Sequence, residues 1–177
     1  MKKVKLADKN FRLFIDSNEL NNAIKTLAEK VNKDYSENPP IFLCVLNGSF
    51  IFASELIKRF NYDCKVSFIK LSSYEGVSST GKIQELIGIN ESLNQKDIII
   101  VEDIVDTGLT VANIIKELLN LNPKSIEVAT LLFKPEAYKE EIEIKYKAIE
   151  VDNEFLVGFG LDYNGLGRNL EEIYIID

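Results

Sequence analysis

The sequence predicts an α/β fold with a mostly parallel, twisted sheet flanked by helices. Short apolar runs, typical of buried strands, alternate with longer segments whose apolar residues have helical spacing. The central runs are apolar on both faces, which is the pattern of a parallel sheet covered on both sides. The 177 residues are 46% hydrophobic and contain no linker or repeat. We therefore expect one domain spanning residues 1–177.

The first 71 residues are expected to supply two helices and two strands. Apolar side chains every three or four residues predict the helices, and continuous apolar runs predict the strands. In order, the elements are a helix over 20–31 capped by Asp16 or Ser17, a strand over 41–46, a turn over 47–49, a helix over 50–60 and a strand over 66–71.

The remaining residues continue this alternation after a polar segment. Residues 72–82 are small, polar and contain glycine, as in a flexible loop. After it we expect strands over 83–89 and 97–103, a turn over 106–110, a helix over 111–119, strands over 125–133, 146–151 and 155–161, and a turn with a last short strand in 165–177.

The composition excludes several classes of function. Lys and Arg number 21 against 28 Asp and Glu, and the net charge of −7 argues against a general nucleic-acid or anionic-membrane binder. The absence of histidine excludes a Ser-His-Asp triad and a His-ligated zinc, so a general base must be a carboxylate, Lys or Tyr. Two cysteines cannot form a four-Cys metal site. No apolar run reaches the roughly 18 residues of a membrane span, and we expect a cytoplasmic protein.

Two acidic residues end the apolar strand expected over 97–103. Ligands of such sheets bind at the carboxyl ends of the strands, where Glu102 and Asp103 lie. Successive strand side chains point to opposite faces, so at least one of the two acids faces a covered side. A buried carboxylate needs a cation, a metal or ligand hydroxyls as a partner. Ribose hydroxyls would suit both acids.

The next segment, 106–110, has the composition of a phosphate-binding turn. The first turn of a helix offers unpaired N–H groups, and Gly108 allows the backbone to approach a ligand closely. Thr107 and Thr110 add hydroxyl groups. Alone, such a segment is more often a simple helix cap. The acidic pair just before it favours a phosphate site, although the Walker A and dinucleotide motifs are absent from the sequence.

Residues 101–110 resemble the phosphoribosyl-pyrophosphate signature of the type I phosphoribosyltransferases. Further motifs resemble the hypoxanthine-guanine members of that family and occur in the family's order. They are Asn47-Gly48-Ser49, Ser73-Tyr74, residues 132–135, residues 157–163 and Arg168. The resemblance implies the family's fold, with a small hood formed by the chain ends. It also implies transfer of a 5-phosphoribosyl group from phosphoribosyl pyrophosphate to hypoxanthine and guanine, with Mg²⁺ and release of pyrophosphate.

The same resemblance implies a role for each matching residue. For the ribose and 5′-phosphate these are Glu102, Asp103, Asp106, Thr107, Gly108, Leu109 and Thr110, with Asp106 as the catalytic base. For pyrophosphate they are Asn47, Gly48 and Arg168; for the purine, Lys134, Phe155, Leu156 and Asp162; for Mg²⁺, Glu102, Asp103 and Asp162. Ser73 and Tyr74 would contact the donor from a lid over 72–82. Family members are homodimers or homotetramers.

Other functions stay open at this point. The base could be xanthine, adenine or a pyrimidine, although an ammonium at Lys134 cannot donate usefully to the 6-amino group of adenine. Many members carry Lys where this chain has Asn47, so a side-chain role there is absent. The same fold also serves RNA-binding regulators, which would require a basic face. A catalytically idle paralogue is disfavoured because Glu102, Asp103, Asp106 and Lys134 are all present.

Overall fold

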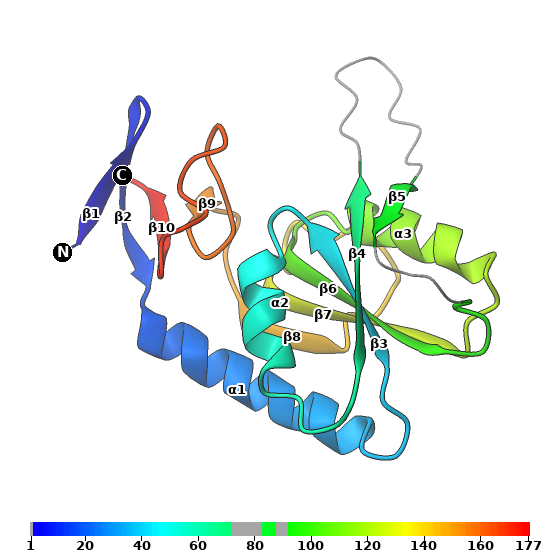
Figure 1. Cartoon of the computed structure of the whole chain (residues 1–177). Helices are drawn as coiled ribbons and strands as arrows, with labels where there is room; N and C mark the ends of the chain where they lie inside the picture. Colours follow the sequence, from blue (N-terminus) through cyan, green and yellow to red (C-terminus); the bar gives the residue numbers. More distant parts are fainter. Residues whose placement is uncertain (1, 72–82, 88–91) are drawn as a thin grey trace.

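The computed structural model describes residues 2–71, 83–87 and 92–177 and arranges them around two sheets (Figure 1). The larger sheet has the order β5-β4-β3-β6-β7-β8, and the smaller has the order β1-β2-β10-β9. In the larger sheet β4, β3, β6, β7 and β8 are parallel, whereas β5 runs antiparallel to β4. The predicted mostly parallel sheet flanked by helices is confirmed.

The elements follow the predicted order, with two additional strands at the amino terminus. The strands are β1 (Lys3–Leu6), β2 (Lys9–Ile15), β3 (Ile41–Leu46), β4 (Lys65–Leu71), β5 (Ile83–Ile87), β6 (Asp97–Val105), β7 (Ser125–Phe133), β8 (Tyr146–Glu150), β9 (Leu156–Val157) and β10 (Ile173–Ile176). The helices are α1 (Ser17–Asp34), α2 (Phe50–Ile57) and α3 (Leu109–Leu119).

Each face of the larger sheet is covered by helices, so its strands are apolar on both sides. Alternation along β3 sends Phe42 and Cys44 into a core with the apolar faces of α1 and α2. Leu43 and Val45 enter a second core with the apolar face of α3. Figure 1 shows α1 and α2 on one face of this sheet and α3 on the other. This double burial explains why the strands read as continuous apolar runs.

The predicted cap of the first helix is present. The Asp16 side chain accepts a hydrogen bond from the Glu19 N–H at 2.9 Å and thereby satisfies one of the free donors of the first turn. α1 then presents Leu20, Ile24 and Leu27 to the core. None of the helices described is long and apolar enough to cross a membrane.

The two chain ends pair to form the smaller sheet, and we call this sheet together with the connection from β9 to β10 the hood. β10 pairs antiparallel with β2 on one side and with β9 on the other, so both termini lie in this sheet (Figure 1). The strand expected over 155–161 is wrong beyond Val157, because Gly158 and Gly160 have φ angles of 101° and 106°, which leave the strand conformation. The helix expected over 50–60 ends at Ile57.

Candidate active site

A cavity of about 250 Å³ lies at the carboxyl end of β6, where the sequence predicts the chemistry. Its lining consists of residues 102–108, Thr110 and Val111. Helix α3 begins beside it at Leu109, so the amino end of an 11-residue helix faces the acidic strand end. A site for an anion and a site for hydroxyl or cationic groups are therefore adjacent.

Of the two acids of β6, Glu102 is buried and Asp103 is half-buried. Glu102 is 7% exposed, and among the described residues its Oε2 atom has no hydrogen-bond partner. Burial, followed by the nearby Asp103 charge, raises the pKa of Glu102 well above its usual value. Burial raises the pKa of Asp103 to about 6, against the opposing effects of backbone N–H groups and Arg168. Such a pair is suited to a ligand that brings hydroxyl donors or positive charge.

The turn after β3 lies directly against Asp103. The Leu46–Asn47 peptide is cis, and the Ser49 hydroxyl donates to the Val45 carbonyl at 2.6 Å. A Cβ atom added to Gly48 would lie 1.7 Å from Oδ2 of Asp103. Only glycine permits this approach.

The same turn also contacts the hood. A Cβ atom added to Gly160 would lie 2.0 Å from the carbonyl oxygen of Gly48. Nη1 of Arg168 donates a hydrogen bond to the Gly160 carbonyl at 2.7 Å. The Arg168 Nη2 lies 2.5 Å from Oδ1 of Asp162, and Oδ2 of Asp162 accepts from the Gly165 N–H at 2.6 Å. The hood thus places a guanidinium and a carboxylate beside the turn.

The turn before α3 is framed by the segment that follows β7. Gly108 has a φ of 88°, and a Cβ atom added to it would lie 2.4 Å from Cε2 of Tyr138. The Lys139 N–H donates to the Thr107 carbonyl at 3.1 Å. The Thr107 hydroxyl accepts from the Leu109 N–H at 3.4 Å. These contacts fix the backbone that surrounds the cavity.

An ion pair joins the ends of β6 and β7. Nζ of Lys134 lies 2.8 Å from Oδ2 of Asp106, and the Lys134 side chain is 9% exposed whereas that of Asp106 is 47% exposed. Nζ also donates to Oδ1 of Asn153 at 3.3 Å. A nearly buried ammonium and a half-exposed carboxylate therefore share one side of the site.

An aromatic side chain two residues after Asn153 is open to solvent. Phe155 is 48% exposed, and its ring makes a T-shaped contact with Tyr163, with the ring centroids 5.8 Å apart. Phe11 supports it with a centroid distance of 6.4 Å. Leu156 follows in β9 and is buried. An exposed ring on a rigid aromatic support is suited to stack on a flat heterocycle.

Comparison with known proteins identifies the family of this chain. The profile of the family described as "Phosphoribosyl transferase domain" matches residues 16–164. The chain belongs to this family. It is 38% identical to the hypoxanthine-guanine phosphoribosyltransferase of Staphylococcus aureus (strain Mu50) over 162 residues, which cover 91% of this chain and 90% of that protein.

Solved structures of phosphoribosyltransferases share the fold. A hypoxanthine phosphoribosyltransferase from Staphylococcus aureus superposes with a TM-score of 0.85 at 36% identity, over 94% of this chain and 91% of the other. A hypoxanthine-guanine phosphoribosyltransferase from Bacillus anthracis gives a TM-score of 0.84 at 32% identity, over 94% of this chain and 96% of the other. The phosphoribosyltransferase fold therefore extends over nearly the whole chain.

The structure brings most of the predicted residues of this phosphoribosyltransferase together. One cavity is lined by Glu102, Asp103, Asp106, Thr107, Gly108 and Thr110. Leu109 begins α3, Gly48 packs against the Asp103 carboxylate, and Lys134 forms an ion pair with Asp106. Ser73, Tyr74 and the predicted lid lie outside the described residues. Asn153 was not predicted, because nothing in the sequence indicates that it contacts Lys134.

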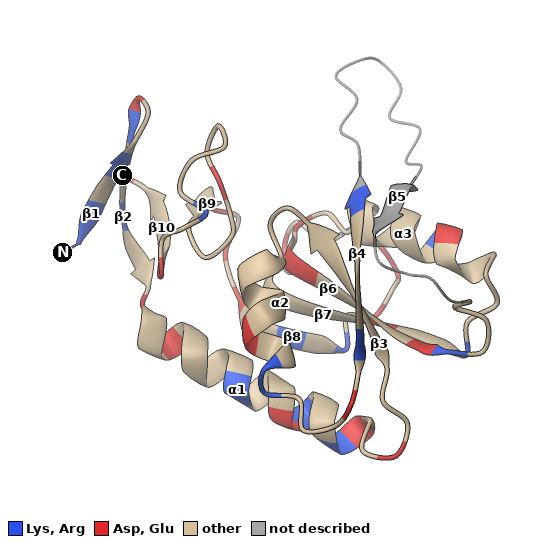
Figure 2. Ribbon diagram, viewed as in Figure 1, with Lys and Arg blue, Asp and Glu red and all other residues tan. Residues whose placement is uncertain are grey.

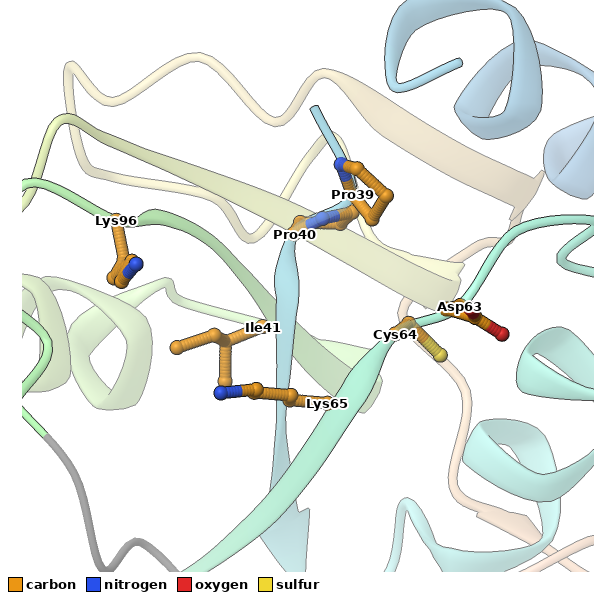
Figure 3. Close-up of a pocket in the computed structure, with 7 residues that line it drawn as sticks. All are labelled: Pro39, Pro40, Ile41, Asp63, Cys64, Lys65 and Lys96. Carbon is orange, nitrogen blue, oxygen red and sulfur yellow. The ribbon is translucent and has the colours of Figure 1, made fainter. Parts of the chain in front are cut away.

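A second cavity of about 250 Å³ lies at the opposite end of the larger sheet (Figure 3). It is lined by Pro39, Pro40, Ile41, Asp63, Cys64, Lys65 and Lys96, which precede or begin β3, β4 and β6. Because ligands of these sheets bind at the carboxyl ends of the strands, this cavity at the amino ends is separate from the active site.

Proposed function

We propose that the chain transfers the 5-phosphoribosyl group of phosphoribosyl pyrophosphate to hypoxanthine or guanine in purine salvage. The products are the corresponding nucleoside 5′-monophosphate and pyrophosphate. The observation that carries this proposal is the Asp106–Lys134 pair, 2.8 Å apart, beside the buried Glu102 and the half-buried Asp103 at the end of β6. The pair offers a base and a donor to a 6-oxopurine, while the acids face the sugar.

Asp106 is the general base in this proposal and Lys134 is the purine selector. A half-exposed carboxylate can take a proton from the purine ring nitrogen, and no histidine exists in the chain to do so. The Lys134 ammonium can donate to the 6-oxygen of hypoxanthine or guanine but not to the 6-amino group of adenine. Phe155 stacks on the base, and the Leu156 backbone meets its edge.

Glu102 and Asp103 hold the ribose hydroxyls in this proposal. Transfer passes through a state with positive charge on the sugar, as in glycoside chemistry, and nearby carboxylates stabilise such charge. Thr107, Gly108, Leu109 and Thr110, with the Asp106 backbone, bind the 5′-phosphate at the amino end of α3. Support comes from the cavity that Thr107, Gly108 and Thr110 share with the acids.

The pyrophosphate and Mg²⁺ belong beside the turn after β3. We assign pyrophosphate binding to Asn47, Gly48 and Arg168. Because Asn47 supplies no positive charge, the turn that carries it would bind pyrophosphate through backbone N–H groups. Mg²⁺ prefers hard oxygen ligands, and the carboxylates of Glu102, Asp103 and Asp162 fit that preference. When bound, Mg²⁺ neutralises charge on the leaving pyrophosphate. In the described part of the chain no three His, Cys, Asp or Glu side chains form a metal-binding group, so these three carboxylates would not hold Mg²⁺ by themselves and substrate oxygens would have to contribute ligands.

The remaining expectations are part of the same proposal. We propose that residues 1–177 act as one unit, that the lid with Ser73 and Tyr74 covers residues 72–82, and that the enzyme is a cytoplasmic homodimer or homotetramer. The match to the hypoxanthine phosphoribosyltransferase of Staphylococcus aureus covers 94% of this chain and 91% of that one, which supports treating residues 1–177 as one unit.

An RNA-binding role is disfavoured by how the basic residues are used. Figure 2 shows Lys and Arg on β1 and β2 of the hood. Lys2 forms an ion pair with Glu172, Lys3 forms one with Asp177, and Lys9 lies 5.5 Å from the centre of the Tyr163 ring. The charges of Lys2 and Lys3 are therefore balanced within the hood, whereas the ring contact leaves the charge of Lys9 in place.

A turnover panel tests the proposal. Hypoxanthine, guanine, xanthine, adenine and uracil are offered separately with phosphoribosyl pyrophosphate and Mg²⁺, and Asp106→Asn is the control. We expect nucleotide from hypoxanthine and guanine, and a loss of about a hundredfold or more in kcat for Asp106→Asn, because the variant keeps the shape but not the base. No product from any base, or full turnover by Asp106→Asn, would contradict the proposal.

A further inference from the structure

The ammonium of Lys134 has two partners and one remaining donor. Nζ carries three N–H groups, of which one is directed to Asp106 at 2.8 Å and one to Asn153 at 3.3 Å. Among the described residues, the third has no acceptor assigned. The three side chains follow β6, β7 and β8, which are neighbours in the larger sheet. Their proximity is therefore a consequence of parallel pairing.

The turn that carries Asn153 is fixed to the end of β7. The Val151 N–H donates to the Phe133 carbonyl at 2.9 Å, and the Glu154 N–H donates to the Asp152 carbonyl at 2.8 Å. Phe133 directly precedes Lys134, so these bonds hold the Asn153 backbone at a set distance from the ammonium. The backbone around Asn153 is thus held near the end of β7, while Asn153 itself is exposed.

We infer that Asn153 is a positioning residue that directs the third N–H of Lys134 toward the 6-oxygen of the purine. This inference rests on the proposed function and deepens it. Because the ammonium has one acceptor in Asp106 and another in Asn153, it cannot direct all of its donors toward Asp106. Because the Asn153 amide is neutral, it orients the ammonium without adding another negative charge beside the base.

Removing the Asn153 acceptor should change the orientation of the Lys134 ammonium. Charge-assisted hydrogen bonds are stronger than neutral ones, so an ammonium without Asn153 turns toward the Asp106 carboxylate. The donor aimed at the purine is then lost, and the base is more strongly paired. Both effects weaken recognition of a 6-oxopurine, whereas the phosphoribosyl site at Glu102 and Asp103 is unaffected.

Asn153→Ala tests the inference by binding and kinetics. We expect the Kd for inosine 5′-monophosphate, measured by calorimetry, and the KM for hypoxanthine each to rise about fivefold, the size expected for one long hydrogen bond. The KM for phosphoribosyl pyrophosphate and the melting temperature stay unchanged. Asn153→Asp keeps an oxygen acceptor but adds the negative charge that the neutral amide avoids, so it should recover part of the affinity lost in Asn153→Ala. Glu154→Ala, an exposed neighbour on the same turn, is the matched control and binds as the wild type does.

A double-mutant cycle separates positioning from a general structural effect. In a Lys134→Met background, Asn153→Ala should cause no further loss, because Asn153 acts only through the ammonium. Additive losses, an equal loss for phosphoribosyl pyrophosphate, or unchanged nucleotide affinity in Asn153→Ala would each overturn the inference. Nucleotide binding requires no turnover, so a wild type that binds the nucleotide but forms none contradicts only the catalytic proposal. A wild type that does neither overturns both.

Discussion

Replacing Asp103 by Asn should stabilise the protein near neutral pH while it impairs activity. The folded protein raises the pKa of this carboxyl from 3.8 to about 6, mainly because burial disfavours the charge. Between these values the folded state binds more protons than the unfolded state, so the free energy of unfolding falls as the pH rises. Below about pH 4 the carboxyl is protonated in both states and the penalty vanishes. The amide of Asn carries no charge at any of these pH values.

The magnitude follows from the same pKa difference. One pKa unit corresponds to about 1.4 kcal/mol, so ionised Asp103 lowers the free energy of unfolding by about 3 kcal/mol above pH 7. The Ile104 N–H donates to Oδ1 of Asp103 at 3.0 Å, and an Asn oxygen can accept the same bond. Relaxation of a partly exposed side chain reduces the effect, so we expect a gain of about 1 to 3 kcal/mol near pH 8. Near pH 4.5 the gain shrinks to about a third of that value.

Urea unfolding of wild type and Asp103→Asn at a series of pH values between about 4.5 and 8 measures this difference. Asp97→Asn is a matched control at the opposite end of the same strand. Burial tends to raise the pKa of Asp97, but hydrogen bonds from Lys124 and Ser125 outweigh it and lower the pKa. Ionised Asp97 therefore stabilises the fold above its unfolded pKa, and Asp97→Asn should destabilise. A pH-independent difference for Asp103→Asn, or a loss of stability near pH 8, would refute the burial argument.

Three further substitutions test the site. Gly48→Ala places a methyl group 1.7 Å from Oδ2 of Asp103, so the carboxylate must move, and steady-state kinetics should show kcat/KM lowered by about tenfold or more. Wild-type kinetics in Gly48→Ala would show that the close contact between Gly48 and Asp103 is not required for activity. Phe155→Ala removes the exposed ring and should raise the purine KM by about tenfold with little change for phosphoribosyl pyrophosphate, since stacking on a base contributes roughly 1 to 3 kcal/mol. Lys134→Gln should reduce the preference for hypoxanthine over adenine in the turnover panel; an unchanged preference would remove Lys134 from the purine site.

The main sheet could be predicted from the sequence because its signals are local. The run from Ile41 to Leu46 is apolar on both faces and bounded by prolines and a turn, and β3 has those same limits. The first two hood strands, β1 and β2, gave no such signal. In β1, Lys3 and Lys5 alternate with Val4 and Leu6 over only four residues, and β2 pairs with β10 at the opposite end of the chain. Pairing between distant segments decides these strands, and no local pattern reveals it.

The same distinction between local signals and contacts of distant segments applies to the candidate site. The acids of β6 were predictable because charged residues at the end of a buried strand need a partner. The contact of Asn153 with Lys134 was not, because it depends on how far the turn after β8 projects over the end of β7. The approach of Gly48 to Asp103 likewise joins the ends of two different strands.

The position of Gly48 explains why the chain ends belong to the active site. One side of this residue lies against Asp103 of β6, and its carbonyl lies against Gly160 of the hood. Arg168 bonds to the Gly160 carbonyl and lowers the pKa of Asp103 against the effect of burial. The parallel sheet supplies the acids, the base and the phosphate turn, but the guanidinium that partly offsets their charge comes from the hood. Loss of hood pairing would therefore leave the cavity formed while removing a cationic group that the acidic strand end requires.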